Sequence, residues 1–583
     1  MSAKDNVMKA LSEGHGSSRA HRATSTNKNV KYTNLATQVS YLHLIAITIT
    51  ACFLFRKKFD LSLFTIAKTL VHVTFFYYII WGSWLYPFYF SPLRHIPTVS
   101  GFPLWGQFFS IITEECGVPQ RRWHRSLGPV IRYYFPFGSE RLSVASDEGI
   151  RHLTVKNPYN FPKPVRAKLW MIRILGDGVL LAENDAHVSQ RKTLNPGFSI
   201  QAIRTFTPVF WDKALKMTTL QMSEIMSYQK NADDDGPVTL ELLDWFNRCT
   251  LDIIGEAGFG FELSSLEHSG AAIRDAYRMV FNFDIMSRAL HGLQAFFPSS
   301  KHLPAKMNND MEMARGIITK KANEIIDGRL EKAEKALDNK NILTLIAKEN
   351  RRLINAGEPG LSKEAMRDQV MTFLAAGHDT TATGVAWTIH LLASHPDIQH
   401  RTRAEIKEHM PFLFDPKWRA DPVSPSLNEL DPDQLPFLDN LCRESLRYIP
   451  PIPMTVRESV KDDVIDGYAV PAHTVIYMLA NTINRMEWFW GDDADEFNPD
   501  RWNNLPATAV PNSFMTFLQG PRGCIGRKFA EVEMKVMLCI LLSAFEFNIN
   551  NKKVNPEDWK MWRLVLRPRD GVSVHVKPLE HMC

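Results

Sequence analysis

A cysteine near the end of the chain lies in a glycine-rich segment that could bind a metal. Residues 517–526 read FLQGPRGCIG, so three glycines frame Cys524 and Arg522 precedes it. Glycines permit a tight loop that exposes backbone N–H groups, and the apolar helix expected to follow would direct its positive end at the thiol. Both features stabilise a thiolate, the form of cysteine that binds metals. By itself the segment leaves three interpretations open: a packing residue, half of a disulfide or a metal ligand.

A second candidate is a polar pair inside an apolar helix. Residues 363–394 are predicted to form one long helix, with Ser362 as its N-cap and a His-Pro pair after its end. Asp379 and Thr380 lie in its middle, between VMTFLAA and ATGVAW. Buried polar groups there must be hydrogen-bonded or functional, whereas a solvated polar face is the simpler alternative.

A third candidate is a pair of opposite charges on one helix face. Glu444 and Arg447 are three residues apart, a spacing at which helical side chains meet. The default interpretation of such a pair is an exposed ion pair that contributes little stability.

Together these segments resemble the cytochrome P450 family of haem-thiolate monooxygenases. The cysteine segment matches every fixed position of that family's haem-ligand signature. AGHDTT (376–381) resembles its oxygen-activation motif, ESLR (444–447) its Glu-x-x-Arg pair, and FNPDRW (497–502) its Pro-x-Arg segment. The resemblance covers about residues 90–583 in the family's order and separations. It implies a mainly α fold with small β-sheets, preceded here by an N-terminal membrane anchor.

The resemblance also implies a role for each matching residue. Cys524 would be the axial thiolate ligand of haem b, Thr380 would assist oxygen activation, and Asp379 would help to relay protons through water. His378 is expected to be structural. The residues expected to contact the haem or to shape its loop are His187, Arg191, Arg457, Phe517, Gly520, Arg522 and Gly526.

Two further expectations concern a structural network and one position at which this chain departs from the family pattern. Glu444 and Arg447 would join Arg501 in a buried network that supports the cysteine loop. Many family members have tryptophan where this chain has His187, four residues before Arg191. A histidine can still donate a hydrogen bond to a haem propionate, and an ordinary helix-surface histidine is the alternative.

Length and composition fit a large globular enzyme. The chain has 583 residues and a formal net charge of +5, with no basic tract that would indicate a nucleic-acid partner. Its seven cysteines are scattered without a CxxC pair, which argues against a disulfide framework or a zinc site. Short strands are predicted at VIRYYF, RLSVAS and TVIYML, and a second helix at about 240–256.

The N-terminal region is predicted to attach the protein to a membrane. An apolar run at 41–55 ends in three basic residues, and a longer one at about 61–90 is rich in tryptophan and tyrosine. A signal peptide is disfavoured by the long basic lead-in and by the absence of a small-residue cleavage site. The predicted organisation is a polar basic tail (1–37), an anchor of one or two transmembrane helices (38–90), a proline-rich hinge (91–106) and a catalytic domain (107–583).

The function implied is insertion of one atom of O2 into a lipophilic small molecule, by hydroxylation or epoxidation, in secondary metabolite or lipid metabolism. Electrons would come from NADPH through a separate NADPH–cytochrome P450 reductase at the endoplasmic reticulum membrane, with the catalytic domain facing the cytosol. A basic docking face for that partner could comprise Arg191, Lys192, Lys528 and Lys535.

Two alternatives remain at the level of the sequence. One is a P450-type isomerase or dehydratase that rearranges a peroxide without O2 or reductase, which the retained Asp379-Thr380 pair disfavours. The other is a non-enzymatic haem carrier or membrane interaction protein, which the complete motifs disfavour.

Overall fold

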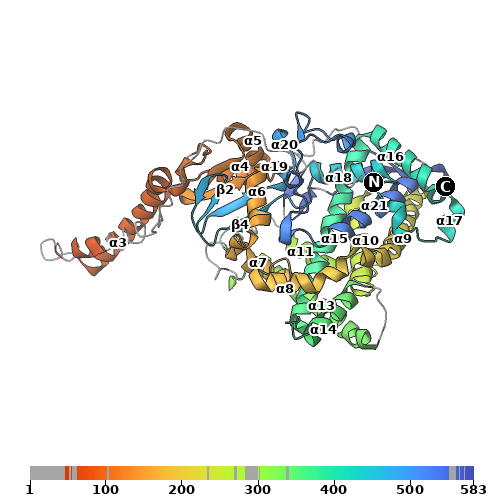
Figure 1. Ribbon diagram of the computed structural model, residues 1–583, viewed down its shortest axis with the longest axis horizontal. Coiled ribbons are helices and arrows are strands. Elements are labelled where there is room, and N and C mark those ends of the chain that lie inside the picture. Colours follow the sequence, from red (N-terminus) through yellow and green to blue (C-terminus); the bar gives the residue numbers. More distant parts are fainter. Residues whose placement is uncertain are drawn as a thin grey trace, which may run out of the picture. The chain divides into compact units, whose positions relative to one another are not determined.

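The chain divides into two compact units, Met1–Phe75 and Phe76–Cys583 (Figure 1). The tail predicted at 1–37 and most of the first apolar run lie outside the described residues. The computed structural model describes residues 46–51, 54, 62–101, 104–232, 236–267, 272–281, 290, 294, 300, 302–335, 341–549, 560–562, 565–569 and 571–582.

One helix in the described part of the chain is long and apolar enough to cross a membrane. It covers Phe64–Phe90, 27 residues, and its most apolar window is not buried in the protein. It combines α3 (Leu63–Tyr77) with the π-helix η1 (Tyr78–Phe90). Length and composition therefore satisfy the requirement for a span.

The second unit is mainly helical. Its longest helices are α9 (Ile200–Ala232), α13 (Lys306–Lys335) and α15 (Lys363–Ser394). The bounds of α15 are those predicted, and Ser362 Oγ accepts the N–H of Ala365 at 3.2 Å. The other α-helices are α4 (Phe108–Thr113), α5 (Val118–Leu127), α6 (Asp147–Arg151), α7 (Val165–Leu175), α8 (Asn184–Leu194), α10 (Leu242–Ile253), α11 (Ala272–Phe281), α14 (Ile342–Asn355), α16 (Pro396–His409), α17 (Pro416–Ala420), α18 (Pro436–Tyr448), α19 (Ala480–Ile483), α20 (Glu487–Trp490) and α21 (Arg527–Ala544).

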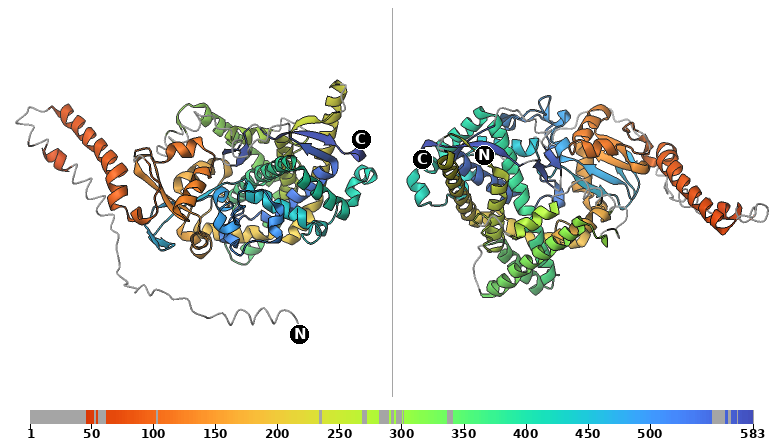
Figure 2. Two further views of the ribbon diagram at one scale, coloured as in Figure 1. Left: turned by 90° about the horizontal axis from the view of Figure 1, so that it is seen from above. Right: turned by 180° about the vertical axis from the view of Figure 1, so that it is seen from behind.

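Helix α15 runs through the core of this unit. Most of its residues from Met366 to Ala393 are buried, and α10, α13 and α21 pack against it (Figures 1 and 2). A helix that is covered on all sides is usually apolar all round, so a polar pair in its middle is unusual. The arrangement places Asp379 and Thr380 inside the molecule.

The strands form small sheets, as predicted. The largest described sheet has the order β1-β2-β7-β4, another has β3-β11-β8, and β5–β6 and β10–β9 are pairs. The three predicted strands correspond to β1, β2 and β7, and β2 pairs with β7 in parallel. The strands are β1 (Val130–Phe135), β2 (Ser139–Val144), β3 (Val238–Glu241), β4 (Thr455–Glu458), β5 (Asp463–Ile465), β6 (Tyr468–Val470), β7 (Val475–Met478), β8 (Phe545–Asn548), β9 (Lys560–Trp562), β10 (Leu566–Pro568) and β11 (Ser573–Pro578).

The helix predicted at about 240–256 begins later and ends differently. Residues up to Glu241 form β3, which pairs with β11 near the end of the chain. The Glu241 carboxylate then accepts the N–H groups of Leu243 and Asp244, both at 2.9 Å, and so caps α10. After Ile253 the chain widens into a π-helical turn.

Candidate haem site

The cysteine loop is a tight turn before α21. A 3₁₀ turn covers Gly520–Arg522, and the N–H of Cys524 donates to the carbonyl of Phe517 at 2.8 Å. Gly520 has φ +70°, and a Cβ there would lie 2.0 Å from the carbonyl oxygen of Thr154. Glycine is therefore required at this position by the neighbouring backbone.

Gly526 has a different environment from Gly520. It is the N-cap of α21, and the nearest atom to a Cβ built on it is a ring carbon of Phe198 at 3.9 Å. The Phe198 ring in turn packs edge-on against Phe373 of α15, with ring centroids 5.2 Å apart. A side chain at Gly526 would thus contact Phe198, which packs against α15.

Cys524 lies two residues before Gly526 in the same loop. The side chain is exposed, yet the protein around it raises the pKa of the thiol, opposed by the Gly526 backbone N–H and by Arg191. Both observations hold if the thiol faces an internal space. Ala376 is likewise exposed in the middle of the otherwise buried α15. A metal cation in that space would bind the thiolate and reverse the pKa shift.

Cationic side chains gather beside this loop. Burial together with Arg457 and Arg522 lowers the pKa of Lys163 to about 7. Burial and then Arg522, Lys163 and Arg191 lower the pKa of His187 to about 4. Arg191 also binds the loop directly, since its Nη1 donates to the carbonyl of Gly523 at 2.7 Å. Such mutual repulsion is costly unless an anion binds among these groups.

The described residues provide this cluster with little negative charge. Glu183 forms an ion pair with Arg522, and its Oε1 lies 3.7 Å from Lys163 Nζ. The Arg522 guanidinium is buried over the ring of Tyr159, and its Nε and Nη1 have no hydrogen-bond acceptor among the described groups. A ligand with two carboxylates fits this set of donors, and the propionates of haem b supply two.

Of the predicted haem contacts, four lie in this cluster and the others shape the loop. Arg457 projects from β4 and is buried, with its Nη1 donating to the Val456 carbonyl at 2.8 Å. His187 lies on α8, is buried, and contacts the Tyr159 hydroxyl through Nδ1 at 3.1 Å. His187 is therefore not the helix-surface histidine that was the alternative interpretation.

The polar pair on α15 is divided between two environments. Asp379 is 2% exposed and forms an ion pair with Arg567 of β10. Thr380 is partly exposed, and its hydroxyl donates to the carbonyl of Ala376 at 2.7 Å. His378 is buried, and its ring packs against Tyr277, so it has the structural environment expected of it.

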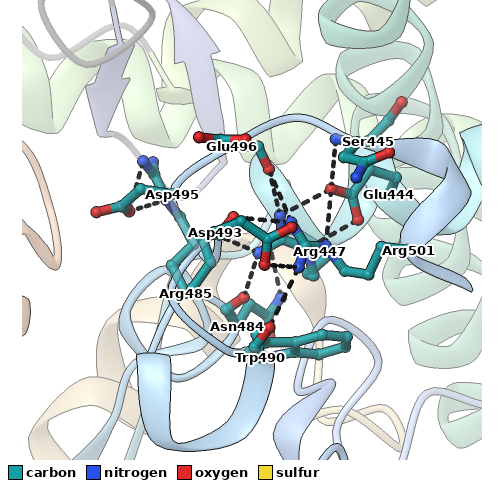
Figure 3. A network of polar contacts seen from close by, with 12 residues as sticks. Glu444, Ser445, Arg447, Asn484, Arg485, Trp490, Asp493, Asp495, Glu496 and Arg501 are labelled. Atoms are coloured by element: carbon teal, nitrogen blue, oxygen red, sulfur yellow. Dashed lines mark hydrogen bonds and ion pairs between the residues drawn. The ribbon is translucent and has the colours of Figure 1, made fainter. Parts of the chain in front are cut away.

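Glu444 and Arg447 form a fully buried pair on α18 (Figure 3). Arg447 Nε and Nη2 each donate to a Glu444 carboxylate oxygen at 2.8 Å. Arg501 joins them, with Nε 3.4 Å from Glu444 Oε1 and Nη1 2.6 Å from Asp493 Oδ1. Trp502 donates its indole N–H to Glu444 at 3.0 Å. The default interpretation, an exposed pair, is therefore wrong for these residues.

This network continues to the cysteine loop through Asn484. Arg447 Nη1 donates to the Asn484 carbonyl at 2.9 Å. The Asn484 side chain donates to Thr516 Oγ1 and accepts the N–H of Met515, both at 2.8 Å. Residues 515 and 516 directly precede Phe517, so hydrogen bonds through Asn484 connect the ion pair to the start of the loop.

One member of the suggested docking face is in the interior. Lys535 is 5% exposed, and its Nζ lies 2.6 Å from Asp439 Oδ1. It points into the packing between α21 and α18 and cannot face a partner. Lys192 and Lys528 are exposed and pair with Glu358 and Glu531, respectively.

Several residues of this site were not identified from the sequence. Lys163, Glu183 and Asn484 carry no motif, and Arg567 is far from Asp379 along the chain. In the sequence these charged residues are separate positions, and only the fold brings them together around the predicted haem contacts. Their roles emerge from ion pairs between distant segments.

The fold and this site define the class of the protein as a haem-thiolate enzyme. A model of the cytochrome P450 family matches residues 96–576. The chain therefore belongs to the cytochrome P450 family; it is a P450 monooxygenase and carries haem b with an axial cysteine thiolate.

Similar proteins come from fungi. The chain is 35% identical over 529 residues to cytochrome P450 monooxygenase FUM15 of Gibberella moniliformis, covering 82% of this chain and 87% of that protein. It is 34% identical over 566 residues to cytochrome P450 monooxygenase ALT8 of Alternaria alternata, covering 86% and 92%. Identity to ganoderic acid synthetase CYP5150L8 of Ganoderma lucidum is 29% over 506 residues, covering 80% and 89%.

Proposed function

We propose that Cys524 is the axial ligand and that the enzyme inserts one atom of O2 into a lipophilic small molecule by hydroxylation or epoxidation. The observation that supports this most strongly is the cation cluster beside the cysteine loop. It is short of negative charge within the described residues, and Arg522 has unused donors. When bound, haem with a thiolate ligand supplies the chemistry of O2 activation.

Around that group the chain's own residues would divide the remaining tasks. His187, Arg191, Arg457 and Arg522 would bind the propionates. Asp379 would help to relay protons through ordered water. Thr380 uses its hydroxyl proton on the Ala376 carbonyl, so its oxygen remains able to accept a hydrogen bond from water.

The loop and its supports would keep the ligand in place. Phe517 accepts the N–H of Cys524, and Gly520 allows the turn to approach Thr154. Gly526 would leave room for the cofactor beside the turn. Glu444, Arg447 and Arg501 would have a structural role, because their hydrogen bonds end at the residues before the loop.

The electron donor would be NADPH–cytochrome P450 reductase at the endoplasmic reticulum membrane, with the catalytic unit facing the cytosol. The apolar helix Phe64–Phe90 supports membrane attachment. Arg191, Lys192 and Lys528 would contribute to the docking face, now without Lys535. The fungal relatives support a substrate from secondary metabolite or lipid metabolism.

The experiment is turnover of the full chain, reconstituted with the reductase in lipid, under ¹⁸O2. Substrate candidates come from comparing metabolites of strains with and without the chain. The expected result is one labelled oxygen atom in the product and a strict requirement for NADPH. Turnover of a hydroperoxide without reductase or label would instead establish an isomerase or dehydratase and overturn the proposal.

A further inference from the structure

Glu183 is an acidic residue placed inside a site built for anions. It directly precedes α8, and its Oε1 accepts the backbone N–H of Lys163 at 3.0 Å. The same carboxylate lies 3.7 Å from Lys163 Nζ and pairs with Arg522. One carboxylate thus contacts two cations of the cluster beside the cysteine loop, Lys163 and Arg522.

The two contacts of Glu183 differ in quality. Its contact with Lys163 is a hydrogen bond to the backbone N–H. That bond does not depend on the conformation of the Lys163 side chain. Its Oε2, which faces Arg522, makes no hydrogen bond of good geometry among the described groups, so charge alone holds that pair. Glu183 can lose the contact to Arg522 while its Oε1 stays hydrogen-bonded to the Lys163 backbone.

Arg522 cannot serve two carboxylates equally. Its guanidinium is buried; Nη2 faces Glu183, and Nε and Nη1 have no acceptor among the described groups. A bidentate contact with a propionate uses two adjacent donors, and a second carboxylate nearby adds like-charge repulsion. A propionate and Glu183 therefore compete for the same group.

We propose that Glu183 is an internal stand-in for a haem propionate. It neutralises Arg522 and Lys163 before the cofactor binds, and the propionate displaces it from Arg522. Its charge then weakens haem retention and favours the more positive, oxidised state of the bound iron. Glu183 is thereby a positioning residue for the cation cluster.

The test uses the haem-loaded full chain with Glu183→Gln, which removes the charge and keeps the shape. Two quantities are measured: the rate of haem transfer to excess apomyoglobin and the midpoint potential of the iron. We expect transfer to be about three- to tenfold slower than in the wild type, with a more positive potential. Faster or unchanged transfer overturns the proposal, because a merely structural carboxylate predicts that result.

A matched control is Asp185→Asn, an exposed carboxyl two residues further along the same segment. It should leave both quantities unchanged. If Glu183→Gln yields no haem-loaded protein, Glu183→Ala carries the test, since it also removes the charge. Its haem transfer should be slower than that of the wild type, and equal or faster transfer overturns the proposal.

Discussion

Asp379 in the middle of α15 forms an ion pair with Arg567 of β10, and the two side chains are 2% and 12% exposed. The carboxylate proposed to handle protons is thus held by a cation from the C-terminal part of the chain. A buried charge is costly without a partner, so Arg567 allows an ionised carboxylate at this place in the core.

Replacement of Arg567 should therefore impair catalysis without removing the haem. For Arg567→Gln we expect normal haem content and about a tenfold loss of product per NADPH consumed, because Asp379 loses the group that orients it. Product, NADPH and peroxide are measured together. Arg569→Gln, on an exposed residue two positions later, is the control. Unchanged coupling in Arg567→Gln would show that this pair is not part of the proton path.

The identity of the iron ligand has a spectroscopic test. Cys524→Ser should abolish the red-shifted Soret band of the reduced, CO-bound protein, because that band requires a thiolate ligand. Cys116→Ser, at a half-buried thiol outside the loop, should retain it. Persistence of the band in Cys524→Ser would assign the ligand to another cysteine.

The buried Glu444–Arg447 pair should contribute far more stability than an exposed pair. Arg447→Met removes the guanidinium that donates two hydrogen bonds to a carboxylate at 0% exposure, so we expect a loss of about 3–5 kcal/mol in the free energy of unfolding. Urea unfolding of the haem-loaded chain measures it. Arg401→Met breaks an exposed pair with Asp500 and should cost about 1 kcal/mol or less. Equal losses in the two variants would contradict a structural role for the network.

Glu533 on α21 predicts a pH dependence of stability. It is fully buried, and burial raises its pKa well above the ordinary value, opposed by the Thr381 hydroxyl. Between the unfolded and the folded pKa the unfolded chain has lost this proton and the folded chain keeps it. The stability that Glu533 contributes is complete below the unfolded pKa and is lost as pH rises toward the folded pKa.

Glu533→Gln cannot ionise, so its stability relative to the wild type should rise with pH. The expected slope is at most about 1.4 kcal/mol per pH unit above about pH 5. Urea unfolding at several pH values provides the comparison. Glu531→Gln is the control, since Glu531 lies on the same helix and pairs with Arg527 and Lys528. A pH-independent difference for Glu533→Gln would show that the carboxyl is ionised in the folded chain.

The sequence by itself determined the family, the cofactor and the bounds of α15. Those features depend on local spacing: four motifs in order, a cap at Ser362 and an apolar run that ends at a His-Pro pair. The start of α10 was predicted less well because residues up to Glu241 pair with β11, and strand pairing across such a separation leaves no local signal.

Only the tertiary structure decided which charges meet. Glu444 and Arg447 have the spacing of an exposed pair, yet the fold buries them and joins them to the cysteine loop through Asn484. Lysine side chains are usually exposed, but Lys535 lies on α21 where its side chain pairs with Asp439. Ion pairs act through space and not along the chain, so Glu183 and Arg522 become partners only after folding places their segments side by side.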